Sequence, residues 1–208
     1  MLRAALGIRV HSGWGALIAV SHGNGTIEIL DRRRIPITGT TDAGASQPYH
    51  AARNLQLPEA ELFIASAFAA AHTAASSALR QIMDVLQAQK YRVTGCAILM
   101  SAARPLPPLE KILTAHPLLH TAEGQFFRDA FAKACASNAL PVTKIKERDL
   151  DLALTEKFAR ATTRIKKQID LAARPLGPPW TADQKLATLA ALLSLKSSPT
   201  EKPRVRKT

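Results

Sequence analysis

The first forty residues constrain the fold of this chain most strongly. Residues 6–20 and 26–37 are apolar runs typical of β-strands, and the segment SHGNGT between them contains an Asn-Gly pair. Asn-Gly favours the positive φ angles of a tight hairpin turn, so the two runs are predicted to pair as antiparallel strands. Arg9 and His11 interrupt the first run, which otherwise has the composition of a central core strand.

Helical and strand patterns alternate along the rest of the chain. Apolar residues recur every three or four positions over residues 59–90, which predicts one long helix. The other predicted elements are a strand at 92–100, a short helix at 108–116, a helix from about 121 to 138, a strand at 140–147, and helices at 150–172 and 181–195. A hairpin followed by this alternation predicts an α/β fold, with a mixed central sheet opened by a β-hairpin and helices on both faces.

Three segments follow one another in an informative order: LGIRVHSGWGALIAV, FFRDAFAKACASNALPVTKIKERDL and PPWTADQKLATLAALLSL. In order and in loose motif they resemble the ribonuclease H-like superfamily and, remotely, its Holliday-junction resolvases. The resemblance is architectural and spans most of residues 6–195. It implies a ribonuclease H-like fold in which the first strand lies centrally in the sheet.

The same resemblance implies a nuclease site that this sequence does not reproduce. Such nucleases hold two magnesium ions with three or four carboxylates. The first acid is expected early in strand one, where this chain has Arg9 and His11, and the second near residues 100–103, which include no acid. Only Asp183, at the start of the last helix, matches the pattern. We therefore expect the usual two-metal cleavage to be absent.

The positive charge of the chain favours a polyanionic partner. The net charge is +12, of which residues 196–208 contribute +4, leaving +8 on the remainder. We predict a single α/β domain over residues 1–195 and a basic, disordered tail over 196–208. A surplus of this size predicts binding of nucleic acid or another phosphorylated ligand, although a basic protein without such a partner remains equally compatible.

Cysteine usage and hydropathy indicate the compartment. Cys96 and Cys135 both lie in apolar segments, and neither has a second ligand at metal-binding spacing. Two core cysteines suit a reducing environment, so a cytoplasmic location is expected. No run reaches 18 consecutive apolar residues, and the N-terminus lacks a signal-peptide pattern, so we expect no membrane contact and no export.

The candidate catalytic residues are His11, His120 and Glu123. His120 and Glu123 are three positions apart at a predicted helix start, which places them on one helical face. An imidazole beside a carboxylate can act as a general base with its orienting partner. The structural alternatives are that Glu123 complements the helix start and that His11 is an ordinary packed side chain.

The candidate ligand-binding residues come from three segments. They are Arg32, Arg33, Gln47, Tyr49, His50 and Arg128. Arginine forks match phosphate or carboxylate oxygens bidentately. Neighbouring strand residues point to opposite faces, so Arg32 and Arg34 of DRRR share one face, Arg33 takes the other, and at most two of the three can serve one site. The polar segment 38–58 is the longest predicted loop, and loops of that length are often functional. A solvated edge and an ordinary loop are the alternatives.

The resemblance brings these candidates together. In a ribonuclease H-like sheet, His11 is expected near Arg32 or Arg33, with the predicted helix start at the same edge. One pocket suited to an anionic ligand would then be formed by His11, Arg32, Arg33, Tyr49, His50, His120 and Glu123. Zinc would need His50, His120 and Glu123 to converge, and these three have no HxxxH or HExxH spacing, so we expect no metal and no cofactor.

Three functions follow from this sequence. The first is a ribonuclease H-like protein without the metal-binding carboxylates that binds nucleic acid or another phosphorylated ligand. The second is a histidine/glutamate acid–base enzyme acting on a small anionic substrate. The third is a partner-binding protein that uses its basic tail as the contact segment. Whether the protein is an enzyme, and in which oligomeric state, is left open by the sequence.

Overall fold

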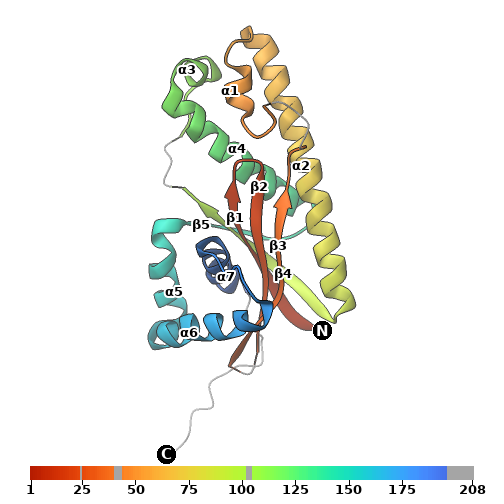
Figure 1. The fold of residues 1–208 in the computed structure, drawn as a ribbon, viewed down its shortest axis with the longest axis vertical. Helices are drawn as coiled ribbons and strands as arrows, with labels where there is room; N and C mark the ends of the chain where they lie inside the picture. Colours follow the sequence, from red (N-terminus) through yellow and green to blue (C-terminus); the bar gives the residue numbers. More distant parts are fainter. Residues whose placement is uncertain (24, 40–43, 102–104, 196–208) are drawn as a thin grey trace, which may run out of the picture.

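A computed structural model describes residues 1–23, 25–39, 44–101 and 105–195 of this chain. The predicted basic tail over 196–208 lies outside these described residues. The elements follow one another as a β-hairpin, a third strand, and then helices alternating with two further strands. Figure 1 shows the sheet between a helical layer containing α2 and α4 and a second layer containing α5, α6 and α7.

The central sheet has five strands in the order β3-β2-β1-β4-β5. The strands are β1 (Leu2–His11), β2 (Trp14–Gly23), β3 (Thr26–Pro36), β4 (Tyr91–Met100) and β5 (Val142–Lys146). β1, β2 and β3 pair antiparallel, whereas β1 with β4 and β4 with β5 pair parallel. This mixed sheet, opened by a hairpin and with β1 at its centre, confirms the predicted α/β class and has the central first strand that the resemblance implies.

The first predicted strand is wrong in one respect: residues 6–20 form two strands. A turn at Ser12-Gly13 separates β1 from β2, and His11 pairs directly with Trp14 across it. Gly13 has a φ of 78°, and a Cβ there would lie 2.7 Å from Thr38 Oγ1, so a glycine is required. The hairpin predicted around Asn-Gly is confirmed as the pairing of β2 with β3, since Gly23 pairs with Thr26. Asn24 itself is outside the described residues.

Seven helices accompany the sheet in the described ranges. They are α1 (Pro48–Ala52), α2 (Leu57–Ala88), α3 (Leu109–Thr114), α4 (His116–Ser137), α5 (Leu150–Phe158), α6 (Thr162–Ala173) and α7 (Ala182–Ser194), with single 3-10 turns at 147–149, 159–161 and 174–176. The N-terminal parts of α2 and α4 extend beyond the sheet and pack there with α1 and α3 (Figure 1). Candidate site residues in α1 and at the start of α4 therefore lie beyond the end of the sheet, outside the core that the sheet forms with the two helical layers.

Two helical predictions need correction. The helix expected over 150–172 is divided into α5 and α6, because Ala159 takes a positive φ of 46° and a 3-10 turn intervenes. α4 starts at His116 rather than near Thr121, with Pro117 in its first turn, a position where proline is favoured because it needs no hydrogen-bond donor. His120 and Glu123 therefore lie beyond the first turn of α4. Thr181 caps the N-terminus of α7, with its Oγ1 accepting from the Gln184 amide at 3.4 Å.

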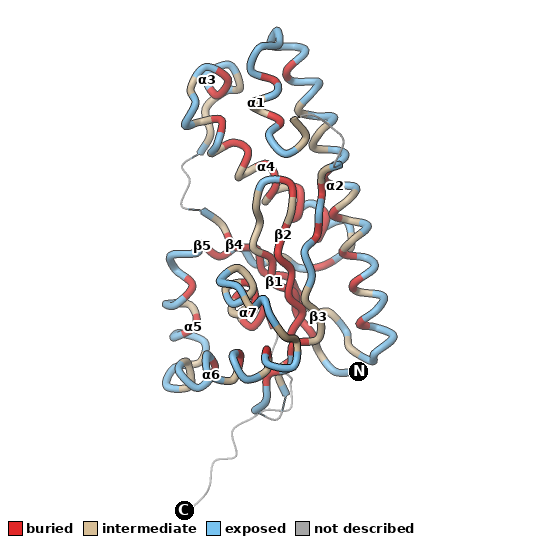
Figure 2. Tube along the Cα trace, in the orientation of Figure 1, coloured by how far each residue is buried: buried red, intermediate tan, exposed pale blue. Residues whose placement is uncertain are grey.

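The core lies on both faces of the sheet because successive strand residues point in opposite directions. Leu17 packs towards α2 and α4 with Phe127 and Phe131, whereas Ile18 packs towards α6 and α7. Figure 2 shows the buried strands between the two helical layers. Gly7 faces α7 so closely that a Cβ would lie 1.9 Å from the Ala187 carbonyl oxygen, which explains the glycine in the first strand.

One helix of the described chain, α2, is long and apolar enough by length and composition to cross a membrane, with a mean hydropathy of 1.4 over 18 residues. Only 17% of that window is buried in the protein. One face of α2 nevertheless contributes Ala71, Ala75, Leu79, Ile82 and Leu86 to the core, as a helix of a globular domain does. The absence of membrane contact stays a prediction.

Candidate functional site

Polar residues gather at the carboxyl end of β1, on the face covered by α7. Asp183, in the first turn of α7, forms an ion pair with Arg9 Nη1 and accepts a hydrogen bond from His11 Nε2 at 2.9 Å. Arg9 also donates from Nε to Glu147 Oε2 at 3.2 Å. Burial lowers the pKa of Arg9, but Glu147 and Asp183 together outweigh that effect and raise it above its ordinary value. Arg9 is therefore a fixed cation held by two carboxylates.

Two further side chains extend this group across the sheet. The rings of His11 and Trp14 are stacked, with centroids 4.2 Å apart and planes 8° from parallel. The guanidinium of Arg34 lies 4.1 Å from the centroid of Trp14, a cation–π distance. We call Arg9, His11, Trp14, Arg34, Glu147 and Asp183 the sheet-end cluster. It links β1, β2 and β3 to the first turn of α7.

The sheet-end cluster does not fit the two magnesium ions that the sequence resemblance to ribonuclease H-like nucleases implies. Magnesium requires several oxygen ligands, and the first strand supplies a guanidinium and an imidazole instead. Asp183, the single acid that matches the pattern of the resembling nucleases, is already paired with Arg9 and His11. A cation held against this carboxylate opposes a second cation at the same place, so we derive no metal-dependent step here.

A basic hollow lies at the same end of the sheet, on the face covered by α4. It has a volume of about 430 Å³ and is lined by Met100, Ser101, Pro105, Gln125, Arg128, Asp129, Lys144 and Lys146. Lys144 Nζ lies 3.5 Å from Asp129 Oδ1, and the charge of Asp129 also acts on Arg128, so the three bases share one carboxylate among the described lining residues. Burial lowers the pKa of Arg128, and its buried Nε has no hydrogen-bond partner in the described part of the chain.

The basic hollow and the sheet-end cluster lie at the same end of the sheet, on its opposite faces. Lys144 and Lys146 are two positions apart on β5 and point to the α4 side, while Ile145 packs towards α5 and α7. Glu147 follows Lys146 directly and binds Arg9 on the other side. Both groups thus surround the carboxyl ends of the parallel strands.

A separate three-histidine cluster lies where α1 meets α4. His50 comes from α1, and His116 and His120 come from the first two turns of α4. One ring nitrogen of each histidine lies within 4.8 Å of the others. The ring centroids are 4.7 Å apart for His50 and His120, 4.6 Å for His116 and His120, and 5.4 Å for His50 and His116.

Glu123 holds one histidine of this cluster, His50, by hydrogen bonds. The side chain is only 3% exposed, and its Oε1 accepts from His50 Nδ1 at 2.9 Å and from the His50 amide at 3.2 Å. The predicted pairing of Glu123 with His120 is wrong, because the carboxylate binds His50, 73 residues away. His116 was not predicted at all, although HPLLH spaces it four residues from His120 on one helical face, and that signal was available.

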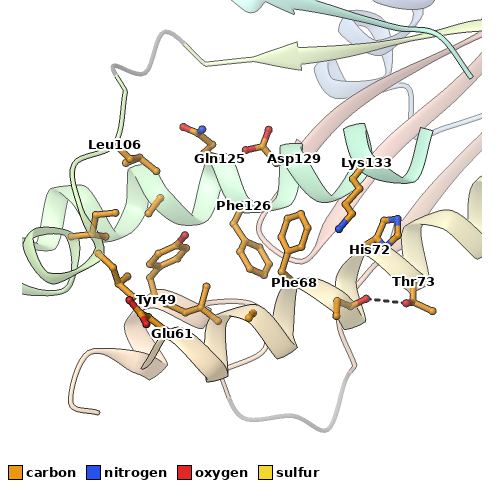
Figure 3. A pocket seen from close by; sticks show the side chains of 16 residues that line it. Tyr49, Glu61, Phe68, His72, Thr73, Leu106, Gln125, Phe126, Asp129 and Lys133 are labelled. Atoms are coloured by element: carbon orange, nitrogen blue, oxygen red, sulfur yellow. Dashed lines mark hydrogen bonds between the residues drawn. The ribbon is translucent and has the colours of Figure 1, made fainter. Parts of the chain in front are cut away.

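A larger groove runs between α2 and α4 (Figure 3), with a volume of about 730 Å³. Its floor includes Phe68 and Phe126, whose ring centroids are 5.3 Å apart in an edge-to-face arrangement. Tyr49 lies at one end, with its ring 6.2 Å from that of Phe126. Burial, and then the charges of Asp129 and Glu123, raise the pKa of Tyr49. Tyr49 is thus predominantly a groove residue rather than part of the histidine cluster.

The predicted single pocket is wrong, because its members belong to separate sites. Arg32 donates to the carbonyls of Leu176, Gly177 and Pro179 and so holds the turn before α7. Arg33 pairs with Asp31, two residues away on the same strand. Arg34, rather than either of these, reaches the group around His11, since it lies opposite Ala16 and Arg9 in the sheet register.

Two other predicted residues have clear places. Gln47 is exposed and precedes α1 as its N-cap, where its side chain makes no capping hydrogen bond. Arg128 lines the basic hollow, away from the histidines. The structure therefore brings together His50, His120 and Glu123, while His11 belongs to the sheet-end cluster.

Comparison with known proteins finds likeness of fold alone. No family model matches the chain, and no curated protein matches it. Thermus thermophilus RuvC in complex with Holliday junction substrate is 12% identical with a TM-score of 0.47, over 92% of this chain and 91% of that one. A further Thermus thermophilus RuvC structure is 12% identical, with a TM-score of 0.45, over 93% and 92%. An Aquifex aeolicus Ppx/GppA family member is 12% identical, with a TM-score of 0.36, over 75% and 39%.

Proposed function

We propose that this protein binds the phosphate backbone of nucleic acid at the carboxyl end of its sheet, without two-metal cleavage. The observation that carries the proposal is the basic hollow, where Arg128, Lys144 and Lys146 face one cavity with a single carboxylate. Phosphate oxygens are the natural partners of such a group, because lysine and arginine neutralise backbone charge and release counterions.

Arg128 is the most informative residue of the hollow. Its Nε is buried and unpaired among the described residues, and burying a guanidinium without an acceptor costs free energy. A phosphate oxygen entering the hollow would accept from that Nε and favour the charged form. Gly124 leaves room for the guanidinium, since a Cβ there would lie 3.1 Å from Arg128 Nη2.

The aromatic residues favour backbone contact over base reading. Trp14 is already packed against His11 and Arg34, so its ring is engaged within the protein. Aromatic residues make up only 5% of the chain, whereas proteins that read single strands rely on exposed stacking platforms. We therefore expect binding with little sequence preference and a strong dependence on salt.

The test is a salt titration of binding to labelled duplex, junction and single-stranded DNA and RNA. Lys144→Gln combined with Lys146→Gln should weaken binding uniformly and reduce the slope of log K against log salt by about 2, because two phosphate contacts are lost. Arg80→Gln combined with Lys167→Gln is the matched control, since it removes the same charge from exposed positions on α2 and α6. Equal losses of affinity in both double variants would show that net charge alone causes the effect and would contradict a role for the hollow. No binding at low salt would refute the proposal.

Arg128→Lys separates the hollow from general basicity. This variant keeps the charge but lacks the planar fork and the Nε donor. We expect it to weaken binding to every probe by a factor similar to that of Arg128→Gln. Full affinity in Arg128→Lys would show that the buried Nε does not meet phosphate.

The hydrogen bond between His50 and Glu123 favours a second candidate, acid–base catalysis on a small anionic substrate. A buried carboxylate that orients an imidazole is the arrangement of a general base and its partner. A screen of phosphate and carboxylate esters should then give a turnover that His50→Ala abolishes and His72→Ala retains. Turnover that survives His50→Ala would remove this candidate.

A further inference from the structure

We infer that His50, His116 and His120 form a zinc-binding site that is independent of the proposed nucleic-acid surface. The three ligand nitrogens lie within 4.8 Å of one another. Tetrahedral zinc with Zn–N bonds of about 2.0–2.1 Å needs nitrogens roughly 3.4 Å apart. His116 and His120 are exposed, so side-chain rotation can close the remaining distance without moving the core.

The two elements that supply the ligands suit a metal site. His116 and His120 are four residues apart on α4, which places both imidazoles on one helical face. His50 approaches them from α1, a short helix packed on α4. The site therefore combines a helical pair with one ligand that is remote in sequence, and zinc would link α1 to α4.

Glu123 supplies what a histidine ligand needs from its surroundings. Its carboxylate accepts from His50 Nδ1, which makes that nitrogen the protonated one and leaves the Nε2 lone pair for a metal. Zinc-binding histidines usually donate their other N–H to a carboxylate or carbonyl in this manner. Glu123 is thus a positioning residue, held in a buried place beneath His50.

The donor set selects the class of metal. Three imidazoles without a thiolate suit zinc, copper or nickel and do not suit magnesium or calcium, which require oxygen ligands. Three protein ligands also leave the fourth position of a tetrahedral ion open to water or an anion, as in catalytic zinc sites. We commit to zinc as the ion.

The test measures zinc binding by untagged protein that has been dialysed against chelator and then freed of it. Competition with a chromophoric chelator should give one zinc per chain. His116→Ala and His120→Ala should each lower the affinity by more than 100-fold, and Glu123→Gln by about 10- to 100-fold, the usual effect of losing an orienting carboxylate. Cobalt should show the visible absorption of a tetrahedral nitrogen site in wild type and lose it in His120→Ala.

His72→Ala is the matched control. His72 is half-buried on α2 and contacts Ser137, so its replacement removes one imidazole without touching the cluster. Full zinc affinity in this variant, with unchanged metal-free melting temperatures in His116→Ala and His120→Ala, would support the site. The inference is overturned if wild type binds no zinc, if His72→Ala loses as much affinity as His120→Ala, or if Glu123→Gln binds as wild type does. None of these readouts involves nucleic acid, so the two proposals fail independently.

Discussion

The sheet-end cluster and the three-histidine cluster each place a histidine against a carboxylate, yet they differ in what else the carboxylate holds. Asp183 accepts a hydrogen bond from His11 and also forms an ion pair with Arg9. Glu123 bonds His50 through both its ring and its amide, and no arginine or lysine is paired with it among the described ion pairs. The first arrangement already contains its cation, whereas the second has three imidazoles and an unbalanced acid. Whether a histidine–carboxylate contact marks a binding site therefore depends on the other charged groups that the carboxylate contacts.

Asp183→Asn should have the largest effect on stability. The change leaves Arg9 with Glu147 alone and removes the acceptor charge for His11 and for the first turn of α7. Charged hydrogen bonds of this partly buried kind contribute about 1.5–3 kcal/mol, so we expect a loss of that size in the free energy of unfolding by urea.

Asp170→Asn is the control for that substitution. Asp170 pairs with Lys185 at 3.2 Å, but its side chain is 60% exposed. An exposed pair contributes little because solvent screens it, and we expect a change within about 0.5 kcal/mol. Equal effects of the two substitutions would show that the sheet-end cluster is no more than a surface ion pair.

Glu123→Ala in the metal-free protein tests the other member of the comparison. It leaves Nδ1 and the backbone amide of His50 without the buried carboxylate oxygen to which both donate. We expect a loss of about 1–3 kcal/mol in the free energy of unfolding, and Glu123→Gln should recover much of it because an amide oxygen still accepts. A stability that does not distinguish alanine from glutamine would refute the orienting role of the carboxylate.

The fold could be predicted from the sequence because its signals are local. The Asn-Gly turn and the alternation of helical and strand periods are read within 10 or 20 residues, and they gave the class and the order of elements. The turn at Ser12-Gly13 was missed because the flanking apolar residues run on as if in one strand. Ala159 has no glycine-like signal, so the division of the helix over 150–172 was not visible either.

The sites could be predicted only in part, because their contacts join distant residues. Arg9 and Asp183 are 174 positions apart, and His50 and Glu123 are 73 apart. The types of residue were recognised, but their partners depend on the packing of α1 and α7. His116 is different, since its spacing to His120 is local and could have been used.

Arg34→Gln should have the smallest effect among the substitutions within the two clusters, and it sharpens the description of the sheet-end cluster. The guanidinium lies over Trp14 at a partly exposed position, where a cation–π contact contributes about 0.5–1 kcal/mol. Urea unfolding should show a loss in that range, and tryptophan fluorescence of the folded protein should change because the indole loses a neighbouring charge. An unchanged spectrum together with unchanged stability would remove Arg34 from the cluster.

The comparison between the two histidine–carboxylate pairs is tested most directly by zinc stoichiometry in three proteins measured side by side. Wild type should bind one ion per chain, His11→Ala should retain that ion at full affinity, and His50→Ala should lose it. Both substitutions remove one imidazole bonded to one carboxylate, so they differ only in which pair they break. Loss of zinc in His11→Ala, or its retention in His50→Ala, would contradict the distinction between the two sites.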